Sequence, residues 1–259
     1  MTPAESYSAD GFYLHTEPIL SADLSSRAAA GQEAICRGEY DTGSTPLSSP
    51  WNPGDSPDKL VKIEQPQFAD RAVWDVVSHA GIGEAAAAIS GAEMVQVWWV
   101  QMLVKPSTDS EEAQTNVGWH QDRQYWKTWE EGSELFTAWV ALSDVEEDCG
   151  PMKFLRGSNH WGLLDNGDFY GQDLDDQSKQ IRGTGREATE EVPAILPAGA
   201  VSYHHCLTFH GSGPNHSGRP RRSLALHMRT EKSCPKDGKK EGLTRFIDDE
   251  TKCPVIWRK

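Results

Sequence analysis

Two short runs, far apart in the chain, carry residue types that bind metal ions. Residues 118–122 contain His120 and Asp122, which one residue separates, and residues 209–215 contain His210 directly before a glycine-rich turn. Two imidazoles and one carboxylate make up the facial triad that binds non-haem Fe(II) and leaves further coordination positions open. The sequence therefore predicts that these three side chains hold one divalent metal ion.

The spacing of the His-x-Asp pair supports this prediction only in part. Two residues apart in a strand, His120 and Asp122 would share one face at a separation of about 6.5–7 Å. An aspartate can also simply orient a nearby histidine, so the pair alone is weak evidence. His204 and His205 are alternatives for the third ligand. We favour His210, because it is expected at a strand end where a sheet holds it, and interpret the other two histidines as supporting residues.

A candidate carboxylate-binding group follows the second run. Arg221 lies eleven residues after His210 and is followed by Arg222 and Ser223. An arginine fork can hold a carboxylate through two parallel hydrogen bonds. Neighbouring residues of a strand face opposite ways, so only one of the two arginines can enter a pocket, and we favour Arg221. A metal triad combined with a carboxylate clamp indicates an Fe(II) oxygenase whose co-substrate is 2-oxoglutarate.

Several spaced motifs, in order, resemble those of the phytanoyl-CoA dioxygenase family, which includes the ectoine hydroxylases. The resemblance covers roughly residues 10–230. The matching residues are Gln101 with Lys105, Trp119-His120-Gln121-Asp122, Trp139, Gly150-Pro151 with Gly157-Ser158-Asn159-His160, and His210-Gly211-Ser212-Gly213-Pro214-Asn215 with Arg221. The resemblance implies Fe(II), 2-oxoglutarate and O2 as the cofactor and co-substrates.

The resemblance also implies roles for individual residues. It makes His120, Asp122 and His210 the iron ligands, and Arg221 the partner of the distal carboxylate of 2-oxoglutarate. Trp126, six residues after His120, is similar to an aromatic residue that lines the substrate pocket. Further implied co-substrate contacts are Ser223, Ser212, Gln101 and Trp139. Lys105 stays open between a contact to an acidic group and a solvated strand end.

The reaction that the resemblance implies is hydroxylation of an aliphatic C–H bond of a small metabolite, with release of succinate and CO2. Desaturation and ring formation need the same residues, so they stay open. Halogenation is disfavoured, because related halogenases lack the carboxylate that Asp122 supplies in this chain. Two alternatives from other classes are a non-catalytic jelly-roll binding protein and a metal-dependent cupin-type hydrolase or isomerase. The first would lose a ligand or the clamp, and the second would not need the clamp.

The elements around these motifs predict a mainly β (α+β) fold. We expect a double-stranded β-helix (a cupin-like jelly roll) covered by N-terminal helices, because helical patterns come early and many short strands follow. The chain is interpreted as one domain, 1–259, with a helical part at about 20–90, a jelly-roll core at about 94–230 and a C-terminal extension at 231–259.

Particular segments carry that expectation. A helix is expected from Ser21 to about Arg37, and residues 67–90 are expected to be helical with a break at residues 81–83. Strands are expected at residues 94–105, 134–142, 192–196, 200–209 and 222–229. In the first of these, alternation places one set of side chains on a single face: Val97, Trp99, Gln101, Leu103 and Lys105.

Composition narrows the class of partner. The formal net charge of −14 argues against nucleic acid and mildly favours a neutral, zwitterionic or cationic small molecule over an acyl-CoA. The chain contains no run of about 18 apolar residues, so no membrane span is expected, and no signal peptide is visible. Five scattered cysteines without a CxxC pattern indicate mostly free thiols in a reducing compartment, so we expect a cytoplasmic location. A monomer or homodimer is expected.

Overall fold

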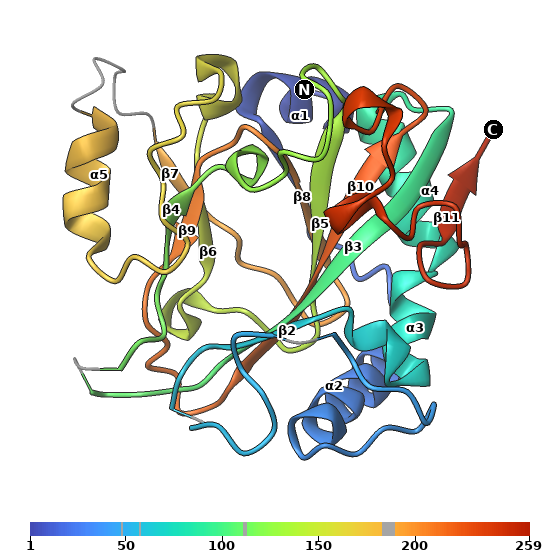
Figure 1. The fold of residues 1–259 in the computed structure, drawn as a ribbon. Helices are drawn as coiled ribbons and strands as arrows, with labels where there is room; N and C mark the ends of the chain where they lie inside the picture. Colours follow the sequence, from blue (N-terminus) through green and yellow to red (C-terminus); the bar gives the residue numbers. More distant parts are fainter. Residues whose placement is uncertain (48, 57, 111–112, 183–189) are drawn as a thin grey trace.

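Two antiparallel sheets face each other at the centre of the molecule (Figure 1). The computed structural model describes residues 1–47, 49–56, 58–110, 113–182 and 190–259, and the strands of both sheets lie within these ranges. The larger sheet has the order β1 (Phe12–His15), β8 (Val201–His205), β5 (Leu135–Ala141), β10 (Arg221–Thr230), β3 (Met94–Lys105) and β11 (Val255–Arg258), with β2 (Val61–Glu64) also paired to β3. The smaller sheet has the order β4 (Val117–His120), β9 (His210–Ser212), β6 (Met152–Leu155) and β7 (Glu191–Pro193). This arrangement is that of a jelly roll, as expected.

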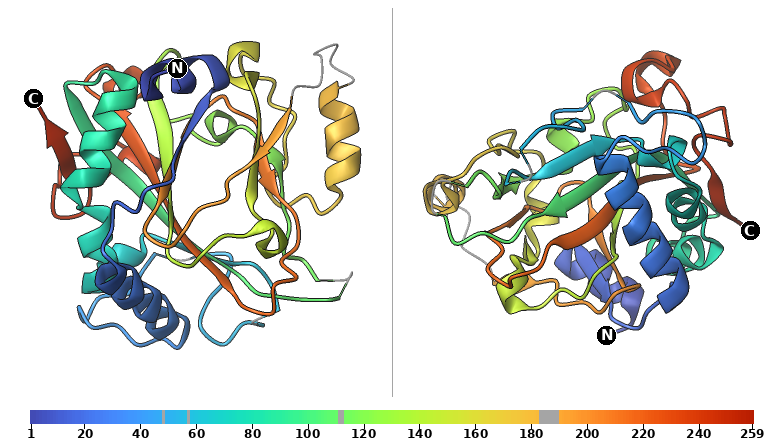
Figure 2. Two further views of the ribbon diagram at one scale, coloured as in Figure 1. Left: turned by 180° about the vertical axis from the view of Figure 1, so that it is seen from behind. Right: turned by 90° about the horizontal axis from the view of Figure 1, so that it is seen from below.

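Helices cover the outer face of the larger sheet (Figures 1 and 2). They are α2 (Ala22–Cys36), α3 (Arg71–Val77) and α4 (Ala80–Ser90), and α2 begins at the expected cap, Ser21. Two helices were not anticipated: α1 (Pro3–Asp10), although Thr2 and Glu5 form a capping box at its start, and α5 (Leu174–Arg182), which lies outside the smaller sheet. Among the described helices, none is both long enough and apolar enough to cross a membrane.

Alternation along β10 separates the core from the space between the sheets. Leu224, Leu226 and Met228 are buried in the cluster that joins the larger sheet to its helices. The intervening positions, among them Ala225, face the smaller sheet with a second apolar cluster. Because side chains of a strand alternate between faces, Arg221 must point into the space between the sheets, and Arg222 away from it.

The predicted alternation of β3 is wrong at one residue. Gln101, Leu103 and Lys105 do share the inner face, where Lys105 bonds to Ser212 of the smaller sheet, but Val97 is buried in the cluster on the helix side. The register between β3 and β10 shifts there, because His227 pairs with Trp99 while Met228 pairs with Val97. Such a β-bulge moves the following side chains to the opposite face, and a pattern of residue types alone does not reveal it.

Other boundaries also differ from the expectation. The helical segment breaks at residues 78–79, between α3 and α4, and not at residues 81–83. The strand expected at 200–209 ends at His205, a turn follows, and a separate strand β9 starts at His210; the strand expected at 192–196 is β7 at Glu191–Pro193. Residues 231–259, expected as an extension, contribute β11 to the larger sheet.

The glycine at position 83, inside α4, is explained by a close contact with β11 and not by a break in the helix. A Cβ atom on Gly83 would lie 2.4 Å from the backbone oxygen of Ile256 in β11, so α4 can approach that strand only without a side chain. We expect Gly83→Ala to lower the free energy of unfolding by about 1–3 kcal/mol, the usual cost of overpacking. Urea denaturation followed by circular dichroism measures this difference.

Gly81→Ala is the matched control on the same helix. Its Cβ would meet only side-chain atoms of His79 and Ile19, at 3.1 Å, and those can move. Alanine also favours a helix over glycine by up to about 1 kcal/mol, so this variant should be neutral or slightly more stable than the wild type. Equal destabilisation by both substitutions would show that the contact with Ile256 is not the reason for glycine at position 83.

Candidate metal centre

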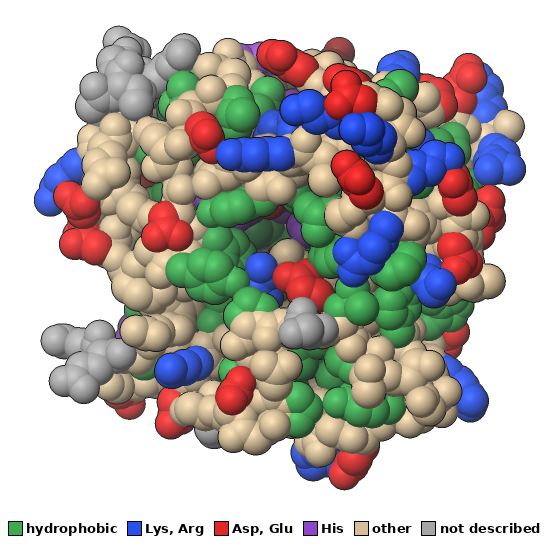
Figure 3. Space-filling model, viewed as in Figure 1, with side chains coloured by type: hydrophobic (Ala, Val, Ile, Leu, Met, Phe, Trp, Pro, Cys, Tyr) green, Lys and Arg blue, Asp and Glu red, His purple; other side chains and the backbone are tan. Residues whose placement is uncertain are grey.

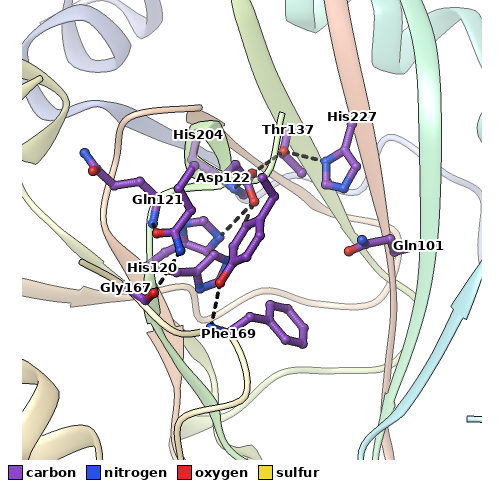
Figure 4. Close-up of polar contacts among 12 residues, drawn as sticks. Gln101, His120, Gln121, Asp122, Thr137, Gly167, Phe169, His204 and His227 are labelled. Atoms are coloured by element: carbon purple, nitrogen blue, oxygen red, sulfur yellow. Dashed lines mark hydrogen bonds and ion pairs between the residues drawn. The ribbon is translucent and has the colours of Figure 1, made fainter. Parts of the chain in front are cut away.

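The three predicted ligands meet between the two sheets, and Figure 4 shows two of them, His120 and Asp122. His120 ends β4 and His210 begins β9, and the two residues are directly paired across these strands. Asp122 begins the short 3-10 helix η2 (Asp122–Gln124), so the expectation that one strand carries both His120 and Asp122 is wrong. One ligand atom from each residue lies within 4.8 Å of the others, and all three side chains are buried.

Backbone carbonyls orient both imidazoles. The Nδ1 of His120 lies 2.7 Å from the Gly118 oxygen, and the Nδ1 of His210 lies 3.0 Å from the Thr208 oxygen. A carbonyl can only accept, so each Nδ1 donates and each neutral ring keeps its lone pair on Nε2. Burial, followed by the neighbouring His120, lowers the pKa of His210 well below its usual value, which favours this neutral form.

The distances between the donor atoms suit bonds to a shared divalent ion better than direct hydrogen bonds. The Nε2 atoms of His120 and His210 each lie 3.7 Å from Oδ1 of Asp122. That distance is too long for a hydrogen bond, but two bonds of about 2.0–2.2 Å to a shared ion can span it. Two neutral nitrogens and a carboxylate oxygen are also the donor set that Fe(II) accepts in a facial triad.

The second carboxylate oxygen of Asp122 is held by two other side chains. Thr137 Oγ1 donates to Oδ2 across 2.7 Å, and His204 Nε2 lies 3.2 Å from the same oxygen. Burial by itself would raise the pKa of Asp122, but the surrounding imidazoles, His210 foremost, hold that pKa well below its usual value. His205 lies apart from this group, since its Nδ1 accepts from the backbone N–H of Leu207.

Thr137 therefore orients the carboxylate, and its removal should weaken metal binding. We expect Thr137→Val, which keeps the shape but loses the hydroxyl, to lower Fe(II) affinity by about 10- to 100-fold, as for other partners of metal ligands. Anaerobic metal titration measures the affinity. Thr137→Ser is the control, because it keeps the donor and should stay near the wild-type value. An unchanged affinity in the valine variant would contradict this role.

An inner cavity of about 40 Å³ extends from the three ligands to Arg221. Gln101, Trp139 and Ser212 line it, as expected from the sequence. The guanidinium of Arg221 lies 5.3 Å from the ring centre of Trp139, donates to the Gly150 carbonyl, and leaves its buried Nε without a partner among the described residues. Burial lowers the pKa of Arg221 to about 10.

Lys105 adds a second buried cation at the same end. It lies directly opposite Arg221 across the β3–β10 pair, and its Nζ donates to Ser212 Oγ at 2.7 Å. Burial, and then the charge of Arg221, lowers the pKa of Lys105 well below its usual value. The alternative of a solvated strand end is therefore wrong. Within the described part of the chain neither cation has a carboxylate partner, and two like charges facing each other across strands are unfavourable unless an anion lies between them.

Ser223 does not reach this cavity. It is buried on β10, and its hydroxyl donates to the Leu103 carbonyl at 3.3 Å. Trp126 also does not line the inner cavity; it lines a second, outer cavity. Gln101, Trp139 and Ser212 thus lie where a co-substrate contact is possible, and their predicted role in binding it stays a prediction, whereas Ser223 bonds within the sheet.

The outer cavity, of about 450 Å³, opens to the surface. Figure 3 shows a hollow near the centre of this face, lined by hydrophobic side chains and with histidine inside it. Its aromatic wall consists of Trp99, Tyr125, Trp126, Phe169 and Tyr170. It shares Gln101, Asp122, Phe169 and His227 with the inner cavity, so the metal site lies where the two meet.

Sequence reasoning missed part of this outer wall. Lys62, Glu64, Phe169, Tyr170 and His227 all line it, and none belongs to a motif. Lys62 and Glu64 alternate along β2, which is a signal for a shared face, but nothing local shows that this face meets a cavity.

Comparison with known proteins agrees with this geometry. The model of the phytanoyl-CoA dioxygenase (PhyH) family matches residues 10–223. The chain belongs to that family. The family predicted from the sequence motifs is thereby confirmed.

Two curated relatives are dioxygenases. A probable alpha-ketoglutarate-dependent hypophosphite dioxygenase of Stutzerimonas stutzeri is 32% identical over 111 residues, which is 42% of this chain and 38% of that protein. The dioxygenase cdmD of Talaromyces verruculosus is 27% identical over 158 residues, 60% of this chain and 46% of that protein. The chain thus spans less than half the length of either curated relative.

A solved structure shares the fold. A non-heme alpha-ketoglutarate-dependent carbocyclase from nogalamycin biosynthesis, SnoK, superposes with a TM-score of 0.69 at 21% identity, covering 94% of this chain and 89% of its own. At such low identity the likeness concerns the architecture alone. It confirms the jelly roll predicted from the sequence.

Proposed function

We propose that this family member is an Fe(II)- and 2-oxoglutarate-dependent dioxygenase that hydroxylates an aliphatic C–H bond of a small molecule and releases succinate and CO2. One observation carries the proposal. A buried cavity has a metal-ligand set at one end and Arg221 at the other, and Lys105 lies beside that end, opposite Arg221 across the β3–β10 pair and bonded to Ser212 of the cavity wall. Neither cation has a carboxylate partner in the described structure. 2-Oxoglutarate has the complementary ends, a chelating 2-oxo acid and a distal carboxylate.

In this proposal each group of residues in the chain has a separate role. His120, Asp122 and His210 hold the iron, which when bound supplies the oxidising chemistry with O2 and 2-oxoglutarate. Arg221 receives the distal carboxylate through its fork, and Lys105 adds charge and keeps Ser212 in place. Leu103, Val117, Met152 and Ala225 give the inner cavity apolar walls, which exclude water from the reacting centre.

The alternatives account for less of this site. A non-catalytic binding protein would have no need of a complete ligand set next to an anion site. A cupin-type hydrolase or isomerase would have no use for a pair of buried cations, which destabilise the fold unless an anion binds. Hydroxylation, desaturation and ring formation use the same residues, and we favour hydroxylation as the simplest outcome.

We also propose a single catalytic unit over residues 1–259, monomeric or homodimeric, with a small-molecule substrate and with neither nucleic acid nor membrane as partner. The acidic net charge of −14 supports the exclusion of nucleic acid. All five cysteines are free thiols, which supports a reducing, cytoplasmic setting.

A turnover assay without added substrate tests the proposed activity. Reconstituted protein should consume O2 and convert 2-oxoglutarate slowly to succinate, and both rates should fall to background when either Fe(II) or 2-oxoglutarate is omitted. Metal-dependent activity that ignores 2-oxoglutarate would favour the hydrolase or isomerase. The absence of 2-oxoglutarate binding together with the absence of any metal-dependent activity would favour the non-catalytic binding protein.

A further inference from the structure

His227 lies where the inner and outer cavities meet, and neither the ligand set nor the 2-oxoglutarate site uses it. It is 3% exposed on β10, with its ring centre 4.8 Å from that of Trp126 and 5.7 Å from that of Trp98. Both cavities are partly lined by it. Figure 4 shows it beside Thr137 and above Gln101, on the side of the carboxylate network that faces away from His120.

A chain of hydrogen bonds determines which nitrogen of His227 carries its proton. Asp122 is an ionised carboxylate and can only accept, so the proton between it and Thr137 Oγ1 belongs to Thr137. A hydroxyl has one proton, so the 2.9 Å contact between Thr137 Oγ1 and His227 Nδ1 must use the proton of Nδ1. Burial lowers the pKa of His227 to about 4, so the ring is neutral near pH 7.

The remaining nitrogen, Nε2, is therefore a hydrogen-bond acceptor with no donor among the described residues. His227 lines both cavities, so water can reach this acceptor until a ligand enters. A ligand that displaced the water without offering a donor would leave the acceptor unsatisfied, which is costly. The cavity at which it lies is where a substrate must pass or bind. A ligand that donates a hydrogen bond at this point would satisfy Nε2.

The charges of the outer cavity, by contrast, are already satisfied within the described wall. Lys62 Nζ lies 3.2 Å from Glu64 Oε1 and 4.5 Å from the ring centre of Phe169. Glu64 also accepts from Trp99 Nε1 at 2.5 Å and from Gln101 Nε2 at 3.3 Å. Asp122 belongs to the metal site. The rest of the described wall is uncharged, with Gln101 and His227 among otherwise aromatic or aliphatic side chains, so a charged ligand would be desolvated there without a free counter-charge.

We propose that the outer cavity binds an uncharged small molecule with an apolar carbon body, and that a hydroxyl or N–H group of this molecule donates a hydrogen bond to Nε2 of His227. This inference rests on the proposed function, because it takes the outer cavity as the substrate site. It narrows the neutral, zwitterionic or cationic class expected from net charge to the neutral one. It also excludes an acyl-CoA from this cavity, since no unpaired cation in the described wall would receive its phosphates.

Two substitutions separate the two roles of His227, which are to accept a hydrogen bond from a ligand and to support Asp122 through Thr137. His227→Gln places an amide oxygen near the position of Nε2 and keeps an acceptor in the cavity. His227→Asn places its amide near Nδ1, so it keeps a donor to Thr137 but removes the acceptor. Both are smaller than histidine, so neither overpacks the site. If Fe(II) affinity is unchanged in the asparagine variant, any effect of that variant on binding is not a result of a disturbed carboxylate.

Four probes with one carbon ring test the class of ligand: cyclohexanol, methoxycyclohexane, cyclohexanecarboxylate and cyclohexylammonium. Their dissociation constants are measured by ligand-observed NMR with the full chain loaded with Zn(II) and 2-oxoglutarate. The wild type should bind cyclohexanol about three- to tenfold more tightly than its methyl ether, the range for one neutral hydrogen bond. His227→Gln should keep that preference, and His227→Asn should lose it.

Three results would overturn the inference. They are tighter binding of the carboxylate or the ammonium probe, a preference for the alcohol that survives in His227→Asn, and binding of none of the four probes. Titration of 2-oxoglutarate into the same wild-type sample tests the proposed function separately. If 2-oxoglutarate binds while the probes behave otherwise than expected, only the assignment of His227 and of the neutral ligand fails.

Discussion

Asp122→Ala is expected to abolish 2-oxoglutarate turnover coupled to product. The substitution removes the one carboxylate of the ligand set, the one whose Oδ1 lies 3.7 Å from each imidazole nitrogen. Loss of a ligand should reduce Fe(II) affinity by more than the about 10- to 100-fold that follows loss of a ligand's outer partner. Succinate formation and anaerobic metal titration measure the two effects.

Asp148→Ala is the matched control for that prediction. Asp148 is an exposed carboxylate of the 3-10 helix η3 (Glu147–Cys149), where it belongs to a separate acidic group with Glu146 and Cys149. Its removal should leave turnover and Fe(II) affinity at the His120, Asp122 and His210 site near the wild-type values. Asp122→Gly is expected to match the alanine variant, with at most a position opened for a halide ion and with poor activity. If Asp122→Ala kept most of its coupled succinate formation, the carboxylate of the facial triad would have been assigned to the wrong residue.

Arg221→Lys should raise the KM for 2-oxoglutarate by about 10- to 100-fold, which corresponds to the loss of a charge-assisted hydrogen bond. Lysine keeps the positive charge but offers a single point of contact in place of a planar fork. Lys105 cannot replace the fork, because its Nζ is already bound to Ser212 and to the Gly213 carbonyl. Steady-state kinetics with varied 2-oxoglutarate measures the change.

Arg222→Lys is the control on the next residue. Arg222 points to the outer face of the sheet, where its Nη2 lies 2.6 Å from Glu33 Oε1 on α2, so the KM should change little. Equal effects at the two positions would contradict the assignment of the clamp to Arg221.

Arg221→Met adds a readout that does not need turnover. In the absence of 2-oxoglutarate the buried guanidinium has no counter-charge in the described structure, so its removal should raise the thermal midpoint of the ligand-free protein while 2-oxoglutarate binding is lost. A fall in the ligand-free midpoint would show that Arg221 stabilises the fold by itself. Differential scanning calorimetry with and without 2-oxoglutarate distinguishes the two results.

The sequence by itself determined the parts of this protein that depend on local pattern. Alternation along β10 was enough to place Arg221 and Arg222 on opposite faces, because successive side chains of a strand face opposite ways whatever the rest of the fold does. The preference for Arg221 as the inward one came from the family resemblance. The bounds of β3 were also predicted correctly, since a β-branched and aromatic run ends at a proline. His120, Asp122 and His210 could be named because their motifs are short and recur in a known family.

Tertiary structure decided what depends on segments that meet only after folding. The bulge that turns Val97 to the helix side arises from pairing with β10, and the glycine at position 83 is explained by a strand more than 170 residues later. Lys105 is a buried cation and not a solvated strand end only because the smaller sheet covers it. The role inferred for His227 needs Thr137 and Asp122 nearby, and the three residues come from three separate segments of the chain. No local pattern carries such information, because the proton of a hydroxyl is assigned only once all its neighbours are in place.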